Sequence, residues 1–198
     1  MGDDSTGKLL IISGPSGAGK STVVSRLIET CELPLELSVS ATTRQARPGE
    51  VDGQHYHFLS QEEFDQRKAG GEFLEAMEVF GQGYWYGTLT EPVQKSLAAG
   101  KWVILEIDVA GALEVFKKFP DVISVFVHPG SMEELENRLR GRKTETDENI
   151  RQRLAVAQSE MEMASSYQHT VINSEVDAAA NQICQLLTTN GEHSCTTN

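Results

Sequence analysis

The chain has 198 residues, enough for one domain with a substantial core, and its apolar and charged fractions are those of an ordinary globular protein. A net charge of −12 argues against nucleic acid and against an anionic membrane as main partners, because both require a basic surface. An acidic protein that handles phosphate groups must therefore gather its positive charge locally.

Helical and strand patterns alternate along the chain, which predicts an α/β fold with a largely parallel sheet flanked by helices. An apolar run at 8–13 predicts a buried strand, and apolar spacing at 22–30 predicts the helix after a glycine-rich turn. Further along we expect buried strands at 102–107 and 122–127, a short strand from 171, a closing helix at 176–187, and a frayed polar tail from 188.

Two stretches interrupt this alternation. Residues 40–89 are rich in strand patterns and contain one helix, whose start is indicated by the capping-box pair Ser60 and Glu63. We interpret them as an insertion in the core. Residues 138–153 are dense in charge and predict an exposed loop, with a helix restarting after Thr146.

A complete phosphate-loop pattern, G-x-x-x-x-G-K-[ST], lies between the first strand and the first helix. Its glycines let backbone N–H groups converge on an anion, Lys20 can bridge the β- and γ-phosphates, and the Ser21 hydroxyl can bind Mg²⁺. A glycine-rich turn without function is the alternative, and the flanking strand and helix weigh against it. The residues expected to bind ATP here are Gly14, Pro15, Ser16, Gly17, Ala18, Gly19, Lys20, Ser21 and Thr22.

A second candidate anion site follows at 40–56. Arg44 and Arg47 lie three residues apart, before a Pro-Gly turn and ahead of Tyr56, and arginine offers several planar donors to a phosphate. Taken alone, this segment could equally be a solvated charged loop.

The chain resembles guanylate kinase from the phosphate loop to the last helix. The motifs that carry the resemblance are GPSGAGKST, SVSATTRQARPGEVDGQHY, FLEAMEVFG, YGT, ILEID, RLRGRKTETDENIRQRL and VIN. It implies a P-loop kinase core with a strand-rich GMP-binding insertion and a small helical lid, and transfer of the γ-phosphoryl group of MgATP to GMP or dGMP.

The resemblance also implies roles for individual residues. It assigns catalysis to Lys20, Arg47, Arg142 and Arg153, and ATP contacts beyond the phosphate loop to Arg138, Arg142 and Asn173. It assigns the GMP pocket to Ser40, Arg44, Arg47, Glu50, Tyr56, Glu75, Tyr86, Gly87, Thr88, Glu106 and Asp108. Glu50 is expected to order the arginines, and Ser40 and Glu75 to face the guanine edge. A carboxylate accepts from both N1–H and the N2 amino group of guanine, although periodicity alone leaves a solvent-facing Glu75 open.

Some positions depart from the family pattern. The stretch 81–86 is about two residues longer than usual, which makes the place of Tyr86 less secure than that of Tyr56. Glu106 stands where Asp is frequent, so a guanine or Mg²⁺-water contact could shift. Ala110 and Ser174 replace a common Gln and a common Asp.

Cationic residues crowd the segment 138–153 of this acidic chain. We expect Arg142 and Arg153 to reach the transferring phosphate, while Arg140, Lys143 and Arg151 pair with acidic neighbours on a solvated surface. No general base is required, because the acceptor phosphate has a second pKa near 6 and is mostly dianionic at neutral pH.

The expected division of the chain is core at 1–39, 99–137 and 161–190, GMP-binding insertion at 40–98, lid at 138–160 and flexible tail at 191–198. Mg²⁺ is the expected cofactor, held by Ser21 and, directly or through water, by Asp108. The partners are ATP and GMP or dGMP, with neither nucleic acid nor membrane. We expect a cytoplasmic monomer, with a dimer left open.

The cysteines and the competing functions complete these expectations. Cys31, Cys184 and Cys195 have no metal-ligand spacing and are interpreted as free thiols in a reducing compartment. One alternative function is a non-catalytic guanylate kinase-like protein-binding module, which the intact Lys20 and Ser21 disfavour. Another is a kinase for AMP or dTMP; Glu75 argues against AMP.

Overall fold

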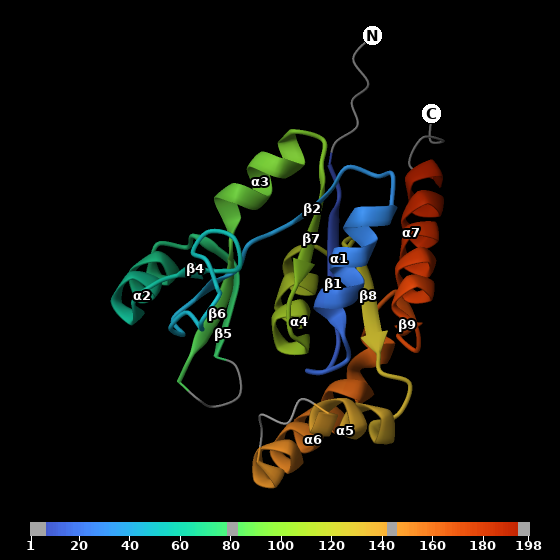
Figure 1. Cartoon of the computed structure of the whole chain (residues 1–198). Coiled ribbons are helices and arrows are strands. Elements are labelled where there is room, and N and C mark those ends of the chain that lie inside the picture. The colour runs from blue at the N-terminus through green and yellow to red at the C-terminus, as the bar shows by residue number, and fades with distance from the viewer. Residues whose placement is uncertain (1–6, 79–82, 142–145, 194–198) are drawn as a thin grey trace. The chain divides into compact units, whose positions relative to one another are not determined.

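The computed structural model describes residues 7–78, 83–141 and 146–193. The chain divides into two compact units: unit 1 is Met1–Leu9, Glu36–Leu105 and Ala110–Val122, and unit 2 is Leu10–Leu35, Glu106–Val109 and Ile123–Asn198. In chain order (Figure 1) the elements are β1 (Leu9–Ser13), α1 (Lys20–Thr30), β2 (Leu35–Leu37), β3 (Ala41–Thr42), β4 (His57–Phe58), α2 (Gln61–Ala69), β5 (Phe73–Glu78), β6 (Trp85–Leu89), α3 (Thr90–Ala98), β7 (Trp102–Glu106), α4 (Val109–Lys118), β8 (Ile123–His128), α5 (Met132–Gly141), α6 (Asp147–Glu162), the 3₁₀ turn η1 (Met163–Ser166), β9 (His169–Ile172) and α7 (Val176–His193).

The fold is α/β with a parallel sheet flanked by helices. Among the described strands, the larger sheet has the order β2-β7-β1-β8-β9 and the smaller one the order β4-β3-β6-β5. In unit 2, β8 pairs in parallel with β1 and with β9. The centres of β1 and β8 are continuous apolar runs that are fully buried, as expected for parallel strands covered on both faces. Within the described residues, no helix is long and apolar enough to span a bilayer.

Helices α5 and α6 form a pair in unit 2. Their facing sides meet in a buried cluster of Leu135, Leu139, Ile150 and Ala157. Helix α6 starts where predicted, because the side chain of Thr146 caps it by accepting from the backbone N–H of Asn149 at 3.3 Å.

The smaller sheet lies in unit 1 and packs against α2. That helix begins with the predicted capping box, in which Ser60 and Glu63 satisfy each other's backbone N–H groups. Its one buried side chain, Phe64, stacks on Phe73 of β5 with ring centroids 4.5 Å apart. In this sheet β3 runs parallel to β4 and antiparallel to β6, which also pairs with β5.

The expected end of the last helix is wrong. The chain does not fray at residue 188, because α7 continues to His193. Within this polar end, the hydroxyls of Thr188 and Thr189 both donate to the carbonyl oxygen of Gln185 in the preceding turn, so these side-chain donors are satisfied inside the helix. The helix α3 and the short strand β2 were not predicted.

The free-thiol interpretation is wrong for two cysteines. Cys31, directly after α1, forms a disulfide with Cys184 on α7, with a Cα–Cα distance of 5.7 Å. The two residues lie 153 positions apart in the sequence, so no local pattern indicated the bridge. Figure 1 shows α1 and α7, the blue and the red helix, side by side. Cys195 lies outside the described residues.

Candidate functional site

Two glycines of the phosphate loop in unit 2 lie so close to neighbouring atoms that no side chain would fit. Gly14 has φ 138°, and a Cβ there would lie 2.4 Å from the carbonyl oxygen of Val127 on β8. Gly19 precedes α1 with φ 87°, and a Cβ there would lie 2.5 Å from Nδ2 of Asn173. A side chain at either position would clash with these atoms and strain the backbone, so this loop conformation requires glycine at both positions.

The side chain of Lys20 bends back over this loop. Its Nζ donates to the carbonyl oxygens of Gly14 at 2.6 Å and Pro15 at 3.1 Å. Burial lowers the pKa of Lys20, and attraction to Glu106, Glu160 and Asp108 opposes that shift. The side chain of Lys20 is thus fixed against a glycine-rich loop at the N-terminus of α1, an arrangement that binds phosphate.

Glu106 contacts the last residue of the phosphate-loop pattern, Ser21. The Ser21 hydroxyl donates to its carboxylate Oε1 at 2.5 Å. Glu106 and Asp108, which the sequence resemblance groups with the GMP pocket, both belong to unit 2, as does the phosphate loop, and their assignment to GMP stays a prediction. Within the described residues, no cluster of three or more His, Cys, Asp or Glu side chains is placed to hold a metal.

Arg138 and Asn173 both donate hydrogen bonds to the phosphate loop. Arg138 donates to the carbonyl oxygens of Ala18 at 3.2 Å and Asn173 at 2.6 Å, and the Asn173 amide donates to the same Ala18 oxygen at 2.8 Å. The predicted ATP contacts thus gather on one carbonyl group of the loop. Arg142, the other predicted cation of this segment, lies outside the described residues.

Helix α6 brings two charged residues to Ser16 of the loop. Arg153 Nη2 donates to the Ser16 hydroxyl at 2.5 Å, and Glu160 accepts from the Ser16 backbone N–H. Burial raises the pKa of Glu160 to about 7, and Lys20 partly offsets this shift. The sequence did not single out Glu160. Its spacing of seven from Arg153, two turns on one helix face, was the available signal.

The predicted phosphate-binding residues of unit 1 form one network. Arg44 is buried and makes a bidentate pair with Glu50, at 2.9 and 2.8 Å, and its Nε donates to the Tyr86 hydroxyl at 3.2 Å. Glu50 also accepts from the backbone N–H of Arg47 at 2.7 Å, while the Arg47 side chain is exposed. Hydrogen bonds from Arg44, then from Arg47, hold the pKa of Glu50 at about 2. The Tyr56 ring lies 5.8 Å from the Tyr86 ring.

Glu75 is buried, which excludes the solvent-facing alternative. Only 6% of it is exposed, and its Oε1 accepts from the Thr88 hydroxyl at 2.7 Å across the β5–β6 pair. Gly87 lets the strands approach, since a Cβ there would lie 2.8 Å from the carbonyl oxygen of Glu75. Ser40 accepts through its backbone carbonyl from His57 at the start of β4. The β5–β6 pair thus presents a buried carboxyl group, hydrogen-bonded to Thr88.

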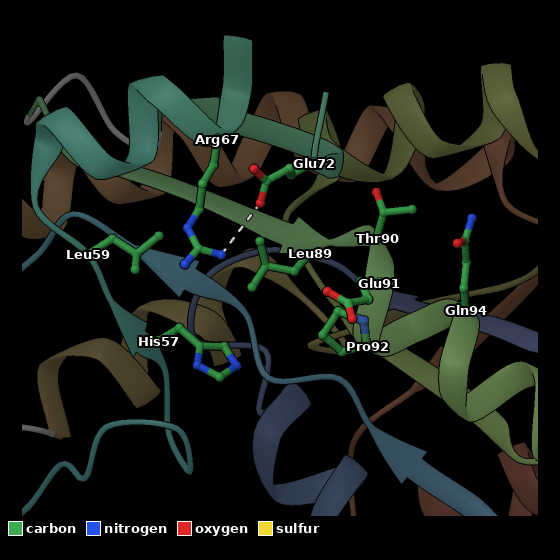
Figure 2. Close-up of a pocket in the computed structure, with 9 residues that line it drawn as sticks. All are labelled: His57, Leu59, Arg67, Glu72, Leu89, Thr90, Glu91, Pro92 and Gln94. Atoms are coloured by element: carbon green, nitrogen blue, oxygen red, sulfur yellow. Dashed lines mark ion pairs between the residues drawn. The ribbon is translucent and has the colours of Figure 1, made fainter. Parts of the chain in front are cut away.

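A cavity of about 450 Å³ lies elsewhere in unit 1. Its wall includes His57, Leu89, Arg67 and Glu72, and none of the predicted GMP residues lines it. Figure 2 shows Arg67 directed toward Glu72, with which it forms an ion pair at 3.6 Å. Arg67 of this cavity is already paired with Glu72, and the cavity lining carries both signs of charge, so we place no substrate there.

Comparison with known proteins finds guanylate kinases by sequence and by structure. Residues 6–190 match the family described as guanylate kinase. The chain is 56% identical over 183 residues to the guanylate kinase of Rhodopirellula baltica, covering 91% of this chain and 87% of that protein. It is 49% identical over 177 residues to that of Caldanaerobacter subterraneus subsp. tengcongensis, covering 89% and 84%. It also resembles the crystal structure of guanylate kinase from Anaplasma phagocytophilum, with a TM-score of 0.76, 32% identity and coverage of 94% and 87%.

Proposed function

This chain belongs to the guanylate kinase family and transfers a phosphoryl group from ATP to GMP, and we propose that its two polar clusters divide the substrates between them. ATP binds the phosphate loop of unit 2, and GMP binds the Arg44 network and Glu75 of unit 1. The observation that carries the assignment of GMP is the buried Glu75 bonded to Thr88, because an acceptor-only group suits the two adjacent donors of guanine.

The ATP half works through backbone amides and cations. When ATP binds, the side chain of Lys20 exchanges its hydrogen bonds to the carbonyl oxygens of Gly14 and Pro15 for bonds to the β- and γ-phosphates. The phosphate oxygens are charged and are therefore stronger acceptors. Arg138 and Asn173 keep the loop in shape through Ala18. Arg153 reaches the transferring phosphate, and resemblance assigns the same role to Arg142.

The residues beside the loop fit Mg²⁺. Ser21 and Glu106 present hard oxygen donors 2.5 Å apart, Asp108 lies two residues further on, and Mg²⁺ is bound by few protein ligands together with phosphate oxygens and water. Bound there, Mg²⁺ would neutralise charge on the β- and γ-phosphates. Because Glu106 contacts Ser21, we assign it to this side of the reaction and not to the guanine base.

In the GMP half, Glu50 aligns Arg44 so that the exposed Arg47 and the two tyrosine hydroxyls can close around a phosphate. Ser40, Glu75 and Thr88 face the base, and the missing side chain of Gly87 leaves room for the strand pair. None of these contacts requires the 2′-hydroxyl, so dGMP is also accepted. We propose that dGMP is a weaker acceptor than GMP.

The chemical step requires positioning and charge neutralisation. A GMP phosphate oxygen attacks the γ-phosphorus, the bond from that phosphorus to its bridging oxygen breaks, and ADP leaves with the bridging oxygen. The acceptor oxygen is already deprotonated near neutral pH, so no side chain has to remove a proton. Lys20 and Arg153 stabilise the charge that spreads over the transferring group.

We further propose that the protein acts as a monomer in the cytoplasm, where both nucleotides are available. A coupled assay of ADP release tests the function, with GMP, dGMP, AMP and dTMP compared at fixed MgATP and a control without acceptor. ADP release that depends on GMP supports the proposal. A pure, folded protein without GMP-dependent turnover would instead be a non-catalytic binding module, and a preference for AMP or dTMP would reassign the base pocket.

A further inference from the structure

Two side chains of helix α6 contact one residue of the phosphate loop, Ser16. Arg153 donates to the hydroxyl of Ser16, and Glu160 accepts from the backbone N–H of the same residue. Both side chains come from α6, seven residues apart, and so they lie on one face of the helix, two turns from each other. Two side chains of α6 thus meet at Ser16.

Glu160 occupies a place where packing alone would favour an apolar side chain. Ile150 and Ala157 of the same helix are buried in the cluster shared with α5, and Glu160 lies three residues beyond Ala157. Its Oε2 atom is buried and accepts no hydrogen bond from the residues that the structure describes. A carboxylate in such surroundings is unfavourable unless it makes specific interactions.

The neighbours of Glu160 belong to the ATP site. Lys20 attracts its carboxylate, and Asp108 repels it. The hydrogen bond from the Ser16 amide is the contact that ties it to the loop. A role for Glu160 in the reaction therefore acts through Ser16.

We propose that Glu160 is a positioning residue for phosphoryl transfer. It anchors the phosphate loop to α6 at Ser16. This anchor holds α6 in the place from which Arg153 reaches the transferring phosphate. This inference rests on the proposed function. When ATP binds, Arg153 exchanges the Ser16 hydroxyl for a charged phosphate oxygen, a stronger acceptor. The backbone bond from Ser16 to Glu160 does not have to break, and it keeps α6 in place during that exchange.

Two conservative variants separate the reach of the side chain from its charge. Glu160→Gln keeps an acceptor oxygen at the same distance from the backbone and loses the charge. Glu160→Asp keeps the charge and is shorter by one methylene, so it cannot reach the Ser16 amide without a shift of the helix. Glu162→Asp, the same exchange at an exposed position two residues on, is the matched control.

The measurements are the Kd of MgADP by calorimetry, kcat and KM for each substrate, and the Tm. We expect Glu160→Asp to weaken MgADP binding and to lower kcat, each about tenfold, as for loss of one hydrogen bond to a charged group. The KM for GMP should stay within about twofold, because the residues assigned to GMP lie in unit 1. Glu160→Gln should remain within about threefold of the wild type, and Glu162→Asp should match it.

Other patterns would overturn the inference. If Gln is impaired and Asp is spared, Glu160 acts through its charge on Lys20 and not as an anchor. If Glu160→Asp changes only the Tm, or changes neither MgADP binding nor kcat, the residue has no part in positioning. Failure of the proposed function is recognised separately, because the wild type would then release no ADP with GMP while its MgADP affinity could still be compared with that of the variants.

Discussion

Breaking the bridge between Cys31 and Cys184 should strongly destabilise unit 2. The disulfide joins the end of α1, the helix that begins at the phosphate loop, to α7 across 153 residues of chain. In the chain-entropy account, the denatured chain loses about 2.1 + 1.5R ln n cal/mol/K when such a loop is closed. For this separation the entropy is about 17 cal/mol/K, or about 5 kcal/mol at 25 °C.

The observed loss should be somewhat smaller than this entropic limit. Residual structure in the denatured chain and a compact reduced state both diminish the gain, and native disulfides typically contribute about 2–5 kcal/mol. For a chain of this size, each kcal/mol corresponds to about 2–4 °C in Tm. We therefore expect Cys31→Ser to lower the Tm by about 10 °C.

The assay is thermal unfolding of wild type, Cys31→Ser, Cys184→Ser and the double variant, each with and without dithiothreitol. The wild type should lose the same stability on reduction as the variants lose by substitution, and the variants should not respond to the reductant. Cys195→Ser is the control and should retain both the wild-type Tm and its response to dithiothreitol.

Thiol labelling provides an independent check. Before reduction, iodoacetamide should modify one of the three cysteines, Cys195, and after reduction and unfolding it should modify all three. Labelling of Cys31 and Cys184 in the unreduced protein, or a wild-type Tm that dithiothreitol leaves unchanged, would refute the reasoning.

Four further predictions concern single side chains. Glu75→Gln should lower kcat/KM for GMP by at least about 10² and raise the AMP/GMP ratio in the coupled assay, because an amide accepts one guanine donor and opposes the other. Arg153→Met should lower kcat by about 10³ and change the KM for GMP much less, as steady-state kinetics would show. Gly19→Ala should weaken MgADP binding measured by calorimetry, because its methyl group would lie 2.5 Å from Asn173 Nδ2 at φ 87°. Arg44 depresses the pKa of Glu50 to about 2, below its usual 4.5, so the stability advantage of wild type over Glu50→Gln should be full above pH 4.5 and vanish as the pH falls through about 2; urea unfolding across this range checks it.

Much of the fold could be predicted because its signals are local. Apolar runs marked the strands β1, β7 and β8, and capping residues marked the starts of α2 and α6 within a few positions. The strand β2 has three residues, too few to show a period, and its pairing depends on distant chain. The end of α7 was placed too early, because the sequence from residue 188 is polar and gives no apolar helical spacing, whereas the helix continues to His193.

The site divides along the same line. The phosphate loop is a contiguous pattern whose spacing already implies a backbone cradle, so the sequence by itself determined that a nucleoside triphosphate is bound and, through the family motifs, that GMP receives the phosphate. The burial of Glu75, the contact of Ser21 with Glu106, the anchor of Ser16 on Glu160 and the Cys31–Cys184 bridge were decided only by the tertiary structure. The contact of Ser21 with Glu106 spans 85 residues and that of Ser16 with α6 spans 137, and such pairs form because the fold buries apolar surface elsewhere, which leaves no periodic trace at the residues that meet.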